Sequence, residues 1–282
     1  AVLSRRIEAP RANAFHACRS WSAWNTMRVG IANQKGGVAK TTNTINVAGA
    51  LAARGHDVLA VDADGQGYLS MRLGLREEYM ADRTNLFNAV KEPMEVDPAE
   101  LIVEHDEFDV LPSNIDMFRI EQELIADGWR QRERLDMVFD RLPEYDFIVV
   151  DAPPHLGAMN DNVLIATQNI LIPIEASEDA RLALEHLFRQ VDTIERRYEV
   201  SIRELGILMS NVEHPIDNDQ RDIIHWAGRF FRDRTPVFEI RNRKSISSAV
   251  NQNHSVFGAD VESDQEIVYE RIAEQLEDAS NE

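Results

Sequence analysis

The stretch Met27–Thr42, MRVGIANQKGGVAKTT, decides the fold of this chain. Its apolar residues Val29 and Ile31 predict a short buried strand, which breaks into a loop with paired glycines before a helical pattern begins. Strand, glycine loop and helix in this order are typical of a phosphate-binding loop, because loop N–H groups and a helix N-terminus surround anionic oxygens. Lys40 is then placed to reach the β- and γ-phosphates of a nucleotide, and the Thr41 hydroxyl to bind Mg²⁺.

The loop departs from the common pattern GxxxxGK[ST], because Gln34 and Ala39 stand where that pattern requires glycine, and a second lysine, Lys35, precedes the glycine pair. The arrangement xKGGxxK[ST] resembles the deviant Walker A motif of the ParA/MinD family of P-loop ATPases. A chance Gly/Lys-rich turn is the competing interpretation, and the unbroken match between a strand and a helix disfavours it. The resemblance implies ATP as cofactor, bound by Gly36, Gly37, Val38, Ala39, Lys40, Thr41 and Thr42. It also implies catalytic roles for Lys40 and for Lys35, which in this family crosses a dimer interface to the partner's nucleotide.

Length and charge indicate one large acidic α/β domain. The chain has 282 residues with 49 acidic and 30 basic side chains, a net charge of −19. Only four of the bases are lysines, and two of these, Lys35 and Lys40, lie in the loop. An acid excess with few lysines is typical of a surface adapted to high intracellular salt, which screens weak ionic contacts.

The single cysteine, Cys18, excludes a disulfide framework and a cysteine-ligated zinc site within one chain. No apolar stretch approaches the roughly 18–20 residues needed to span a bilayer. We therefore expect a protein that is cytoplasmic, or nucleoid-associated if it binds DNA.

Residues 1–26 differ in composition from the rest, with four arginines against one acid and two of the four tryptophans. Ser4-Arg5-Arg6 suggests a twin-arginine export signal, but charged residues interrupt the apolar segment that such a signal needs. The first methionine, Met27, directly precedes the loop strand. We therefore expect residues 1–26 to be a disordered upstream extension and residues 27–282 to form a single ParA-like ATPase domain.

Two further buried strands are expected to bring carboxylates to the edge of the sheet where the loop lies, since ligands bind beyond the carboxyl ends of parallel strands. Residues 57–62, DVLAVD, lead into Asp62-Ala63-Asp64-Gly65-Gln66-Gly67. The family has a DxDPQGN-like stretch here, which implies that Asp64 acts on the attacking water. An acidic turn without chemistry is the alternative, and Gly65 departs from the family's proline.

The second strand lies in residues 145–154, YDFIVVDAPP, and ends in Asp151, as a Walker B strand does. A carboxylate at this edge binds Mg²⁺ directly or through water, so Thr41 and Asp151 are the expected metal ligands. Capping of the next helix is the alternative role for Asp151. The following D-x-P-P sequence resembles a switch segment of the family.

Residues 169–176 and 205–212 are further apolar strands, and the second includes Asn211. In the family an asparagine at this position often hydrogen-bonds adenine, although an ordinary asparagine at a strand end is almost as consistent with the sequence. Between residues 71 and 135 we find no chemistry, and Met117 and Phe118 are expected to pack in the core.

These elements predict an α/β fold, a doubly wound, mainly parallel sheet with helices on both faces. The resemblance covers residues 27 to 279 and implies a ParA-like partition or positioning ATPase. Such a protein forms an ATP-dependent homodimer, hydrolyses ATP slowly, and is activated by a ParB-like partner. The motifs do not distinguish plasmid, chromosome or protein-cluster cargo.

Other members of the superfamily remain alternatives. Iron–sulfur members need cysteines, which residues 27–282 lack. A biosynthetic amide-forming ATPase of the cobyrinic-acid type, or a non-catalytic nucleotide-gated DNA-binding module, would share the loop. A MinD-like ATPase needs a basic amphipathic tail. Here the terminal helical stripe of Val268, Ile272, Leu276 and Ala279 has an acidic outer face, so we expect it to dock on its own domain and not on a membrane.

Residues 229–244 are the candidate for non-specific DNA binding, because they carry six bases against two acids in an otherwise acidic chain. The bases are Arg229, Arg232, Arg234, Arg241, Arg243 and Lys244. Phosphate contacts favour clustered Lys and Arg, and salt weakens them steeply. Pairing of these arginines with surface carboxylates is the alternative.

Overall fold

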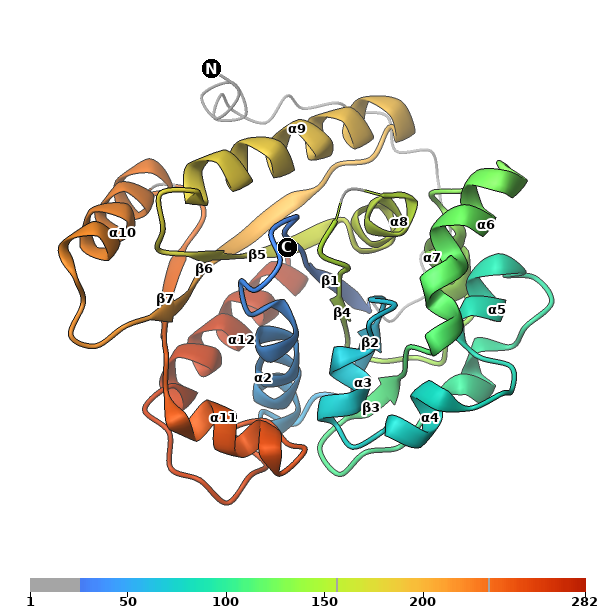
Figure 1. Ribbon diagram of the computed structural model, residues 1–282, viewed down its shortest axis with the longest axis horizontal. Helices are drawn as coiled ribbons and strands as arrows, with labels where there is room; N and C mark the ends of the chain where they lie inside the picture. The colour runs from blue at the N-terminus through green and yellow to red at the C-terminus, as the bar shows by residue number, and fades with distance from the viewer. Residues whose placement is uncertain (1–25, 156, 233) are drawn as a thin grey trace.

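Seven strands form one sheet in the order β3-β2-β4-β1-β5-β6-β7, and every pairing between these strands is parallel (Figure 1). The computed structural model describes residues 26–155, 157–232 and 234–282. The predicted doubly wound parallel sheet is therefore confirmed. The strands are β1 Met27–Ile31, β2 Val58–Asp62, β3 Asp109–Leu111, β4 Phe147–Asp151, β5 Asn169–Glu175, β6 Arg203–Val212 and β7 Val237–Arg241.

Helices cover both faces of this sheet, and parallel strands need such cover because their crossovers place helices on the faces. Among the described residues the α-helices are α2 Lys40–Ala53, α3 Tyr68–Arg72, α4 Arg76–Met80, α5 Leu86–Lys91, α6 Ile120–Asp127, α7 Arg134–Phe139, α8 Ala158–Thr167, α9 Ala180–Tyr198, α10 Asn218–Phe230, α11 Lys244–Asn251 and α12 Glu266–Ser280, with 3-10 turns at Pro98–Leu101 and Ile115–Arg119. None of them combines the length and apolar character that crossing a membrane requires.

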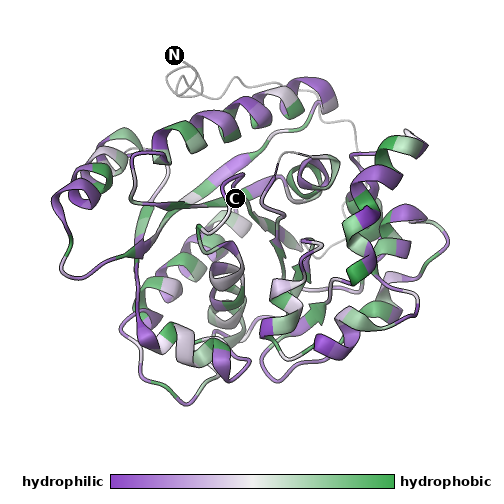
Figure 2. Cartoon of the chain, in the orientation of Figure 1, coloured by the Kyte–Doolittle hydropathy of each residue, from purple (hydrophilic) through white to green (hydrophobic). Residues whose placement is uncertain are grey.

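Two apolar clusters separate along the two faces of the sheet. One joins α5 to α9 with the strands, and the other joins α2, α3, α11 and α12 with the opposite face. Figure 2 shows hydrophobic residues concentrated along the strands, whereas hydrophilic residues are frequent on α9 and α10. The sheet is thus buried on both faces, so polar residues that could bind a ligand are expected at the ends of its strands.

Helix α12 packs against α2, as its apolar stripe predicts. Ile272 and Leu276 are fully buried there, and the buried Tyr269 hydroxyl donates to Asn43 Oδ1 at 2.9 Å. This hydrogen bond ties the last helix to the helix that follows the glycine loop. The apolar face of α12 is therefore occupied by its own domain.

The strand order reverses beside β1, and this reversal positions the site. The chain passes from β1 to β2 and β4 on one side and to β5 on the other, so the carboxyl end of β1 lies at the switch point where sheets of this kind form their ligand crevice. The parallel register pairs Asp62 with Asp151 and Ile31 with Asp151. Two carboxylates and the start of the glycine loop therefore meet at one level of the sheet edge.

The segment between α5 and α7 differs in part from the sequence prediction. Met117 is buried as expected, but Phe118 is 62% exposed, so its predicted place in the core is wrong. The reason is local: residues 115–119 form a 3-10 turn, in which neighbouring side chains point in different directions. The predicted extension, residues 1–26, lies outside the described residues except for Thr26.

Candidate functional site

The loop between β1 and α2 is held in shape by Asn33, which is fully buried. Its side-chain amide donates to the Pro173 carbonyl at 2.6 Å, and its Oδ1 accepts from the Lys35 N–H at 3.0 Å. Gly37 and Ala39 both have positive φ, 81° and 64°. The sequence analysis did not assign Asn33 a role, although a polar residue directly after a buried strand is a signal for such an anchor.

Lys40, Thr41 and Asp151 come together as predicted. The Thr41 hydroxyl donates to Asp151 Oδ2 at 2.6 Å, and the Lys40 ammonium donates to the Lys35 carbonyl at 3.2 Å across the loop. Lys40 is buried, and this burial lowers its pKa, while Asp151 and Asp64 oppose the shift. A hydroxyl and a carboxylate oxygen in direct contact form a ligand pair of the kind that Mg²⁺ prefers.

Asp62 and Asp64 follow each other at the end of β2 but have different surroundings. Asp62 is fully buried, and its Oδ2 accepts from both the N–H and the hydroxyl of Ser70 at 2.8 and 2.7 Å. Asp64 is 7% exposed, and its Oδ1 accepts from the Gln66 N–H at 3.0 Å. Asp64 is close enough to Lys40 and His155 for both to lower its pKa, although burial raises that pKa overall.

The site concentrates acidic groups that resist ionisation. Burial raises the pKa of Asp151 to about 7, against the opposing effects of the Thr41 hydrogen bond and the Lys40 charge. Burial and then the neighbouring Asp151 raise the pKa of Asp62 to about 8. A cation in this crevice would relieve the unfavourable free energy of these buried carboxylates, so the electrostatics favour a bound metal.

Close packing around Gly65 disfavours a proline at this position after Asp64. A Cβ at position 65 would lie 3.0–3.2 Å from the Met117 and Phe118 backbone, and the Gly65 carbonyl accepts from the Tyr79 hydroxyl at 2.9 Å. The segment after β2 is therefore closely packed against the 3-10 turn that precedes α6.

Lys35 is in the loop but its ammonium lies away from Lys40. Its Nζ donates to the Ser177 hydroxyl at 3.3 Å and lies 3.5 Å from Glu175 Oε2 and 3.7 Å from Asp179 Oδ2. The structure therefore does not bring the two loop lysines together on one phosphate position. Lys35 faces the start of α9.

A small pocket of about 100 Å³ adjoins the loop on the side of β6 and β7. Asn211 lines it in a left-handed conformation with φ 56°, and the hydrogen-bonded Asn43 and Tyr269 line it as well. Asn43 Nδ2 also donates to the Ser210 hydroxyl at 3.0 Å. The sequence analysis missed Asn43, because one asparagine within a helical pattern carries no signal. The remaining lining residues are Ala39, Thr42, Ser210, Ile240, Arg241, Asn242, Arg243, Ile246 and Ser247.

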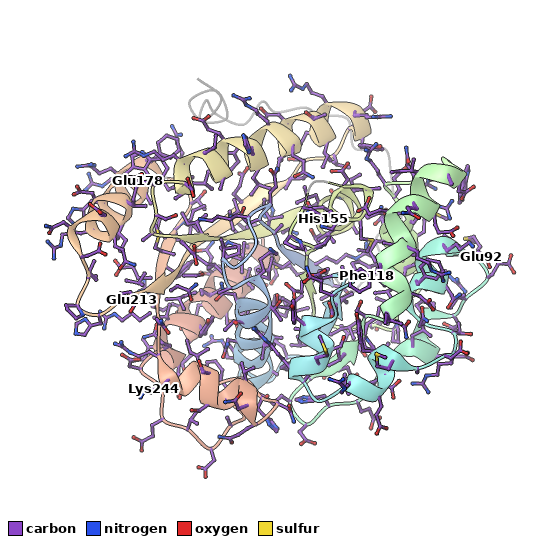
Figure 3. The ribbon with its side chains drawn as sticks, viewed as in Figure 1. Glu92, Phe118, His155, Glu178, Glu213 and Lys244 are labelled. Carbon is purple, nitrogen blue, oxygen red and sulfur yellow. The ribbon has the colours of Figure 1, made fainter. Side chains whose placement is uncertain are left out.

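The basic stretch at residues 229–244 extends along the whole length of β7. Strand β7 is five residues long, about 16 Å, and separates Arg234 from Arg241. Arg243 forms a bidentate pair with Asp264, at 3.0 and 2.9 Å, and this pair lowers the pKa of Asp264 to about 2. Lys244 is exposed at the start of α11 (Figure 3). Arg243 is therefore paired with a carboxylate, whereas no ion pair to Lys244 occurs within the part of the chain that the structure describes.

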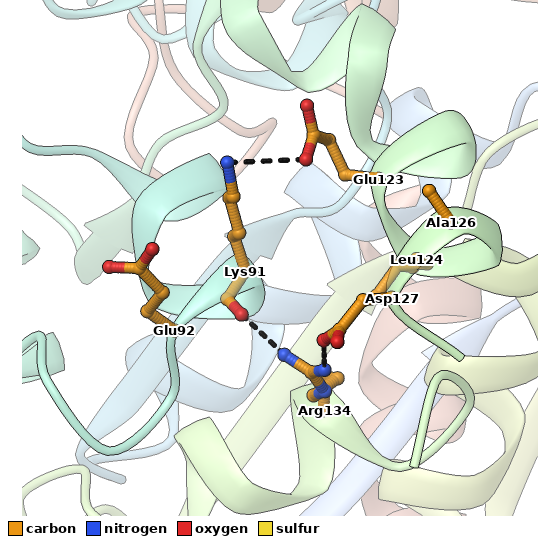
Figure 4. A pocket seen from close by; sticks show the side chains of 7 residues that line it. All are labelled: Lys91, Glu92, Glu123, Leu124, Ala126, Asp127 and Arg134. Atoms are coloured by element: carbon orange, nitrogen blue, oxygen red, sulfur yellow. Dashed lines mark hydrogen bonds and ion pairs between the residues drawn. The ribbon is translucent and has the colours of Figure 1, made fainter. Parts of the chain in front are cut away.

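A larger pocket, about 380 Å³, lies between α5, α6 and the start of α7 (Figure 4). Lys91 pairs with Glu123 at 3.2 Å, and the buried Arg134 donates to Asp127 and to the Lys91 carbonyl. The charged groups that line this pocket are therefore largely neutralised by one another. None of the residues that the loop motif predicted lies in it.

Comparisons with known proteins show the family of this chain. A family model described as an AAA domain matches residues 26–204. The chromosome partitioning protein ParA of Myxococcus xanthus is 30% identical over 213 residues, which cover 72% of this chain and 73% of that protein. The chain belongs to the ParA/Soj family. It is also 32% identical over 203 residues to two uncharacterized proteins of Mycobacterium tuberculosis; these cover 72% of the chain, which spans 63% of their length.

Solved structures with the same fold are similar to this one along most of the chain. A Cyanothece McdA–ATP complex has a TM-score of 0.75 with 21% identity, covering 90% of this chain and 97% of that one. Cobyrinic acid a,c-diamide synthase from Mycobacterium smegmatis, with bound ADP and magnesium, has a TM-score of 0.71 with 26% identity, covering 88% and 93%. The P-loop ATPase fold is therefore shared by relatives with different tasks.

The raised pKa of Asp151 predicts how stability depends on pH. Between about pH 4 and pH 7 the folded chain keeps a proton on Asp151 that the unfolded chain has released, so the free energy of unfolding falls as pH rises through this range. Asp151→Asn removes the contribution of Asp151 and leaves that of Asp62, whose pKa is also raised. Without metal or nucleotide, the variant should therefore melt at least about 2 °C higher than the wild type at pH 8.

Thermal unfolding between pH 5 and pH 8 measures this effect. Asp82→Asn is the matched control, because Asp82 is exposed and its substitution should leave the pH profile unchanged. A variant at Asp151 that is less stable than the wild type at pH 8 would contradict the assignment of the buried charge.

Proposed function

We propose that this protein is a ParA-like partition or positioning ATPase that binds MgATP in the crevice at the end of β1. The observation that carries the proposal is the cluster of Lys40, Thr41 and Asp151, with its 2.6 Å hydroxyl–carboxylate contact. Thr41 and Asp151 would hold Mg²⁺, and the metal would neutralise charge on the phosphates. Lys40 and the loop N–H groups would bind the β- and γ-phosphates. The ATP- and magnesium-bound structures among the fold relatives support this choice of ligand.

We further propose an ATP-dependent homodimer. Lys40 already lies across the loop, so a single site has its phosphate lysine, whereas the Lys35 side chain points away from Lys40 and is 32% exposed. A partly exposed lysine is suited to act on a nucleotide held by a second copy, where it would stabilise charge on the transferring phosphoryl group. Asp64 would orient the attacking water, and Asn211 would contact adenine. A ParB-like protein would accelerate the slow basal turnover.

The amide-forming alternative is supported by the 26% identical cobyrinic acid a,c-diamide synthase structure. The named relatives favour partition, since ParA and Soj proteins of several bacteria are 28–34% identical to this chain. A MinD-like membrane cycle is disfavoured because the apolar stripe of α12 is buried against α2. ATP turnover measured with and without duplex DNA distinguishes these functions.

Lys35→Ala should retain ATP binding and lose partner-stimulated hydrolysis, because Lys40 and Thr41 remain to hold MgATP. The measurement is ATP turnover together with sedimentation of the protein with and without ATP. A Lys40→Ala variant is the comparison, and it should lose nucleotide binding itself. Stimulated turnover at the wild-type rate in Lys35→Ala would refute a role for Lys35 across the dimer.

Asp64→Ala should accumulate an ATP-bound dimer, since it removes water positioning and leaves the metal ligands intact. Asp151→Ala should instead weaken Mg²⁺-dependent ATP binding by roughly tenfold or more. Nucleotide-binding and sedimentation assays compare the two variants. Equal behaviour of both would show that the division of roles between these carboxylates is wrong.

DNA binding is proposed for the edge that carries Lys244. With ATP at low salt, the wild type should bind random duplex DNA. Lys244→Glu should weaken this binding several-fold, and the affinity that remains should still fall as the salt concentration rises. Arg234→Glu, at the other end of β7, is the matched control. Fluorescence anisotropy across a salt series makes the measurement, and a wild type that ignores DNA at low salt would remove DNA from the proposal.

A further inference from the structure

Glu175, the last residue of β5, uses its two carboxylate oxygens for two different partners. Its Oε2 lies 3.5 Å from the Lys35 ammonium, and its Oε1 accepts a hydrogen bond from the Asn211 side-chain amide at 3.1 Å. Lys35 belongs to the glycine loop, whereas Asn211 lines the pocket beside β6 and β7. One carboxylate therefore connects the loop lysine to a residue that lines the pocket beside the loop.

The start of α9 completes the surroundings of Lys35. The Ser177 hydroxyl accepts from Lys35 Nζ at 3.3 Å, and Asp179 Oδ2 lies 3.7 Å from it. Glu175, Ser177 and Asp179 thus surround the Lys35 ammonium. The neighbouring Glu178 is exposed just before α9, and among the described residues it is not one of the partners of Lys35 (Figure 3).

We propose that Glu175 is a positioning residue that holds Lys35 on its own protomer and makes this hold sensitive to the base of a bound nucleotide through Asn211. The inference rests on the proposed function, in which Lys35 acts on the nucleotide of a second copy. It adds to that function a position that Lys35 occupies in the monomer, and the contact of Asn211 with a base as the event that weakens this position.

The strength of the hold suits a reversible contact. The side chains of Lys35 and Glu175 are each 32% exposed, and Asp179 is 75% exposed, so water and salt screen their attraction. Ion pairs of this kind change an equilibrium by about two- to fivefold. That is enough to bias the protomer and too little to prevent assembly.

Asn211 supplies the link to the nucleotide. It adopts φ 56°, a conformation that asparagine tolerates better than most residues, and its amide also lies 3.5 Å from the Gly37 carbonyl. When this amide turns to a purine, Glu175 loses the donor that fixes its rotamer. A partly exposed glutamate then loses more side-chain entropy by keeping its contact with Lys35, so the ion pair weakens without breaking. The base would thus prepare Lys35 to cross to a partner.

Glu175→Gln tests the hold, because the amide keeps an acceptor for Asn211 but loses the charge that attracts Lys35. The ATP-dependent dimer of the full chain should form at about two- to fivefold lower protein concentration than in the wild type. The same gain should shrink at high salt. Glu178→Gln removes an equal charge nearby and should leave the midpoint unchanged.

Analytical ultracentrifugation with ATP and Mg²⁺ measures the dimerisation midpoints. Equal midpoints for Glu175→Gln and the wild type, or an equal gain in Glu178→Gln, would overturn the proposal. A purely structural role for Glu175 would weaken the dimer, so an increased midpoint would overturn it as well.

The coupling to the base is measured on the monomer, which separates this inference from the proposed dimer. The chain has only four lysines, so ¹³Cε signals of labelled lysine resolve Lys35. Inorganic tripolyphosphate fills the loop without a base, and ADP adds the base. The Lys35 signal of the wild type should shift further with ADP than with tripolyphosphate, and this increment should vanish in Asn211→Ala and in Glu175→Gln.

An increment that persists in both variants would overturn the coupling through Glu175, even if the wild type dimerises with ATP. Conversely, a wild type that never dimerises with ATP would refute the proposed function. The base-dependent shift of Lys35 would still decide whether Glu175 and Asn211 act together.

Discussion

The hydrogen bond from the Thr41 hydroxyl to Asp151 joins the first turn of α2 to the end of β4, and the rest of the site depends on this contact. It fixes where the glycine loop ends relative to the sheet. Because the parallel register pairs Asp62 with Asp151, the same contact also sets the distance from the loop to the second strand-end carboxylate. A site built on strand ends is rigid, since each strand is buried on both faces.

This arrangement has an electrostatic cost that function explains. Asp62 and Asp151 are both buried, and burial raises the pKa of each toward or above neutrality. Buried carboxylates that resist ionisation destabilise the metal-free protein at high pH. The same property favours a divalent cation, because its charge compensates both groups at once. The buried carboxylates that would bind a cation thus lower the stability of the protein when no cation is bound.

The acidic surface and the loop chemistry act in opposite directions. A net charge of −19 opposes the approach of anionic ligands, so local positive charge must be concentrated where phosphate binds. Two of only four lysines lie in the loop. One of them, Lys35, is held by acids of its own protomer, whereas Lys40 spans the loop. Lysines that look equivalent in the motif therefore have different surroundings.

The sequence by itself determined the loop, the order of buried strands and the two carboxylates, because parallel strands deliver their carboxyl ends to one edge whatever lies between them. Only the tertiary structure decided the features that depend on packing across distant segments. It exposes Phe118 on a 3-10 turn, divides the basic stretch between the two ends of β7, and places Asn43 between Tyr269 and Ser210. It also rests Lys35 on the end of β5 and the start of α9, about 140 residues further along the chain. Such contacts follow from how helices pack on the sheet, and local periodicity carries no record of that packing.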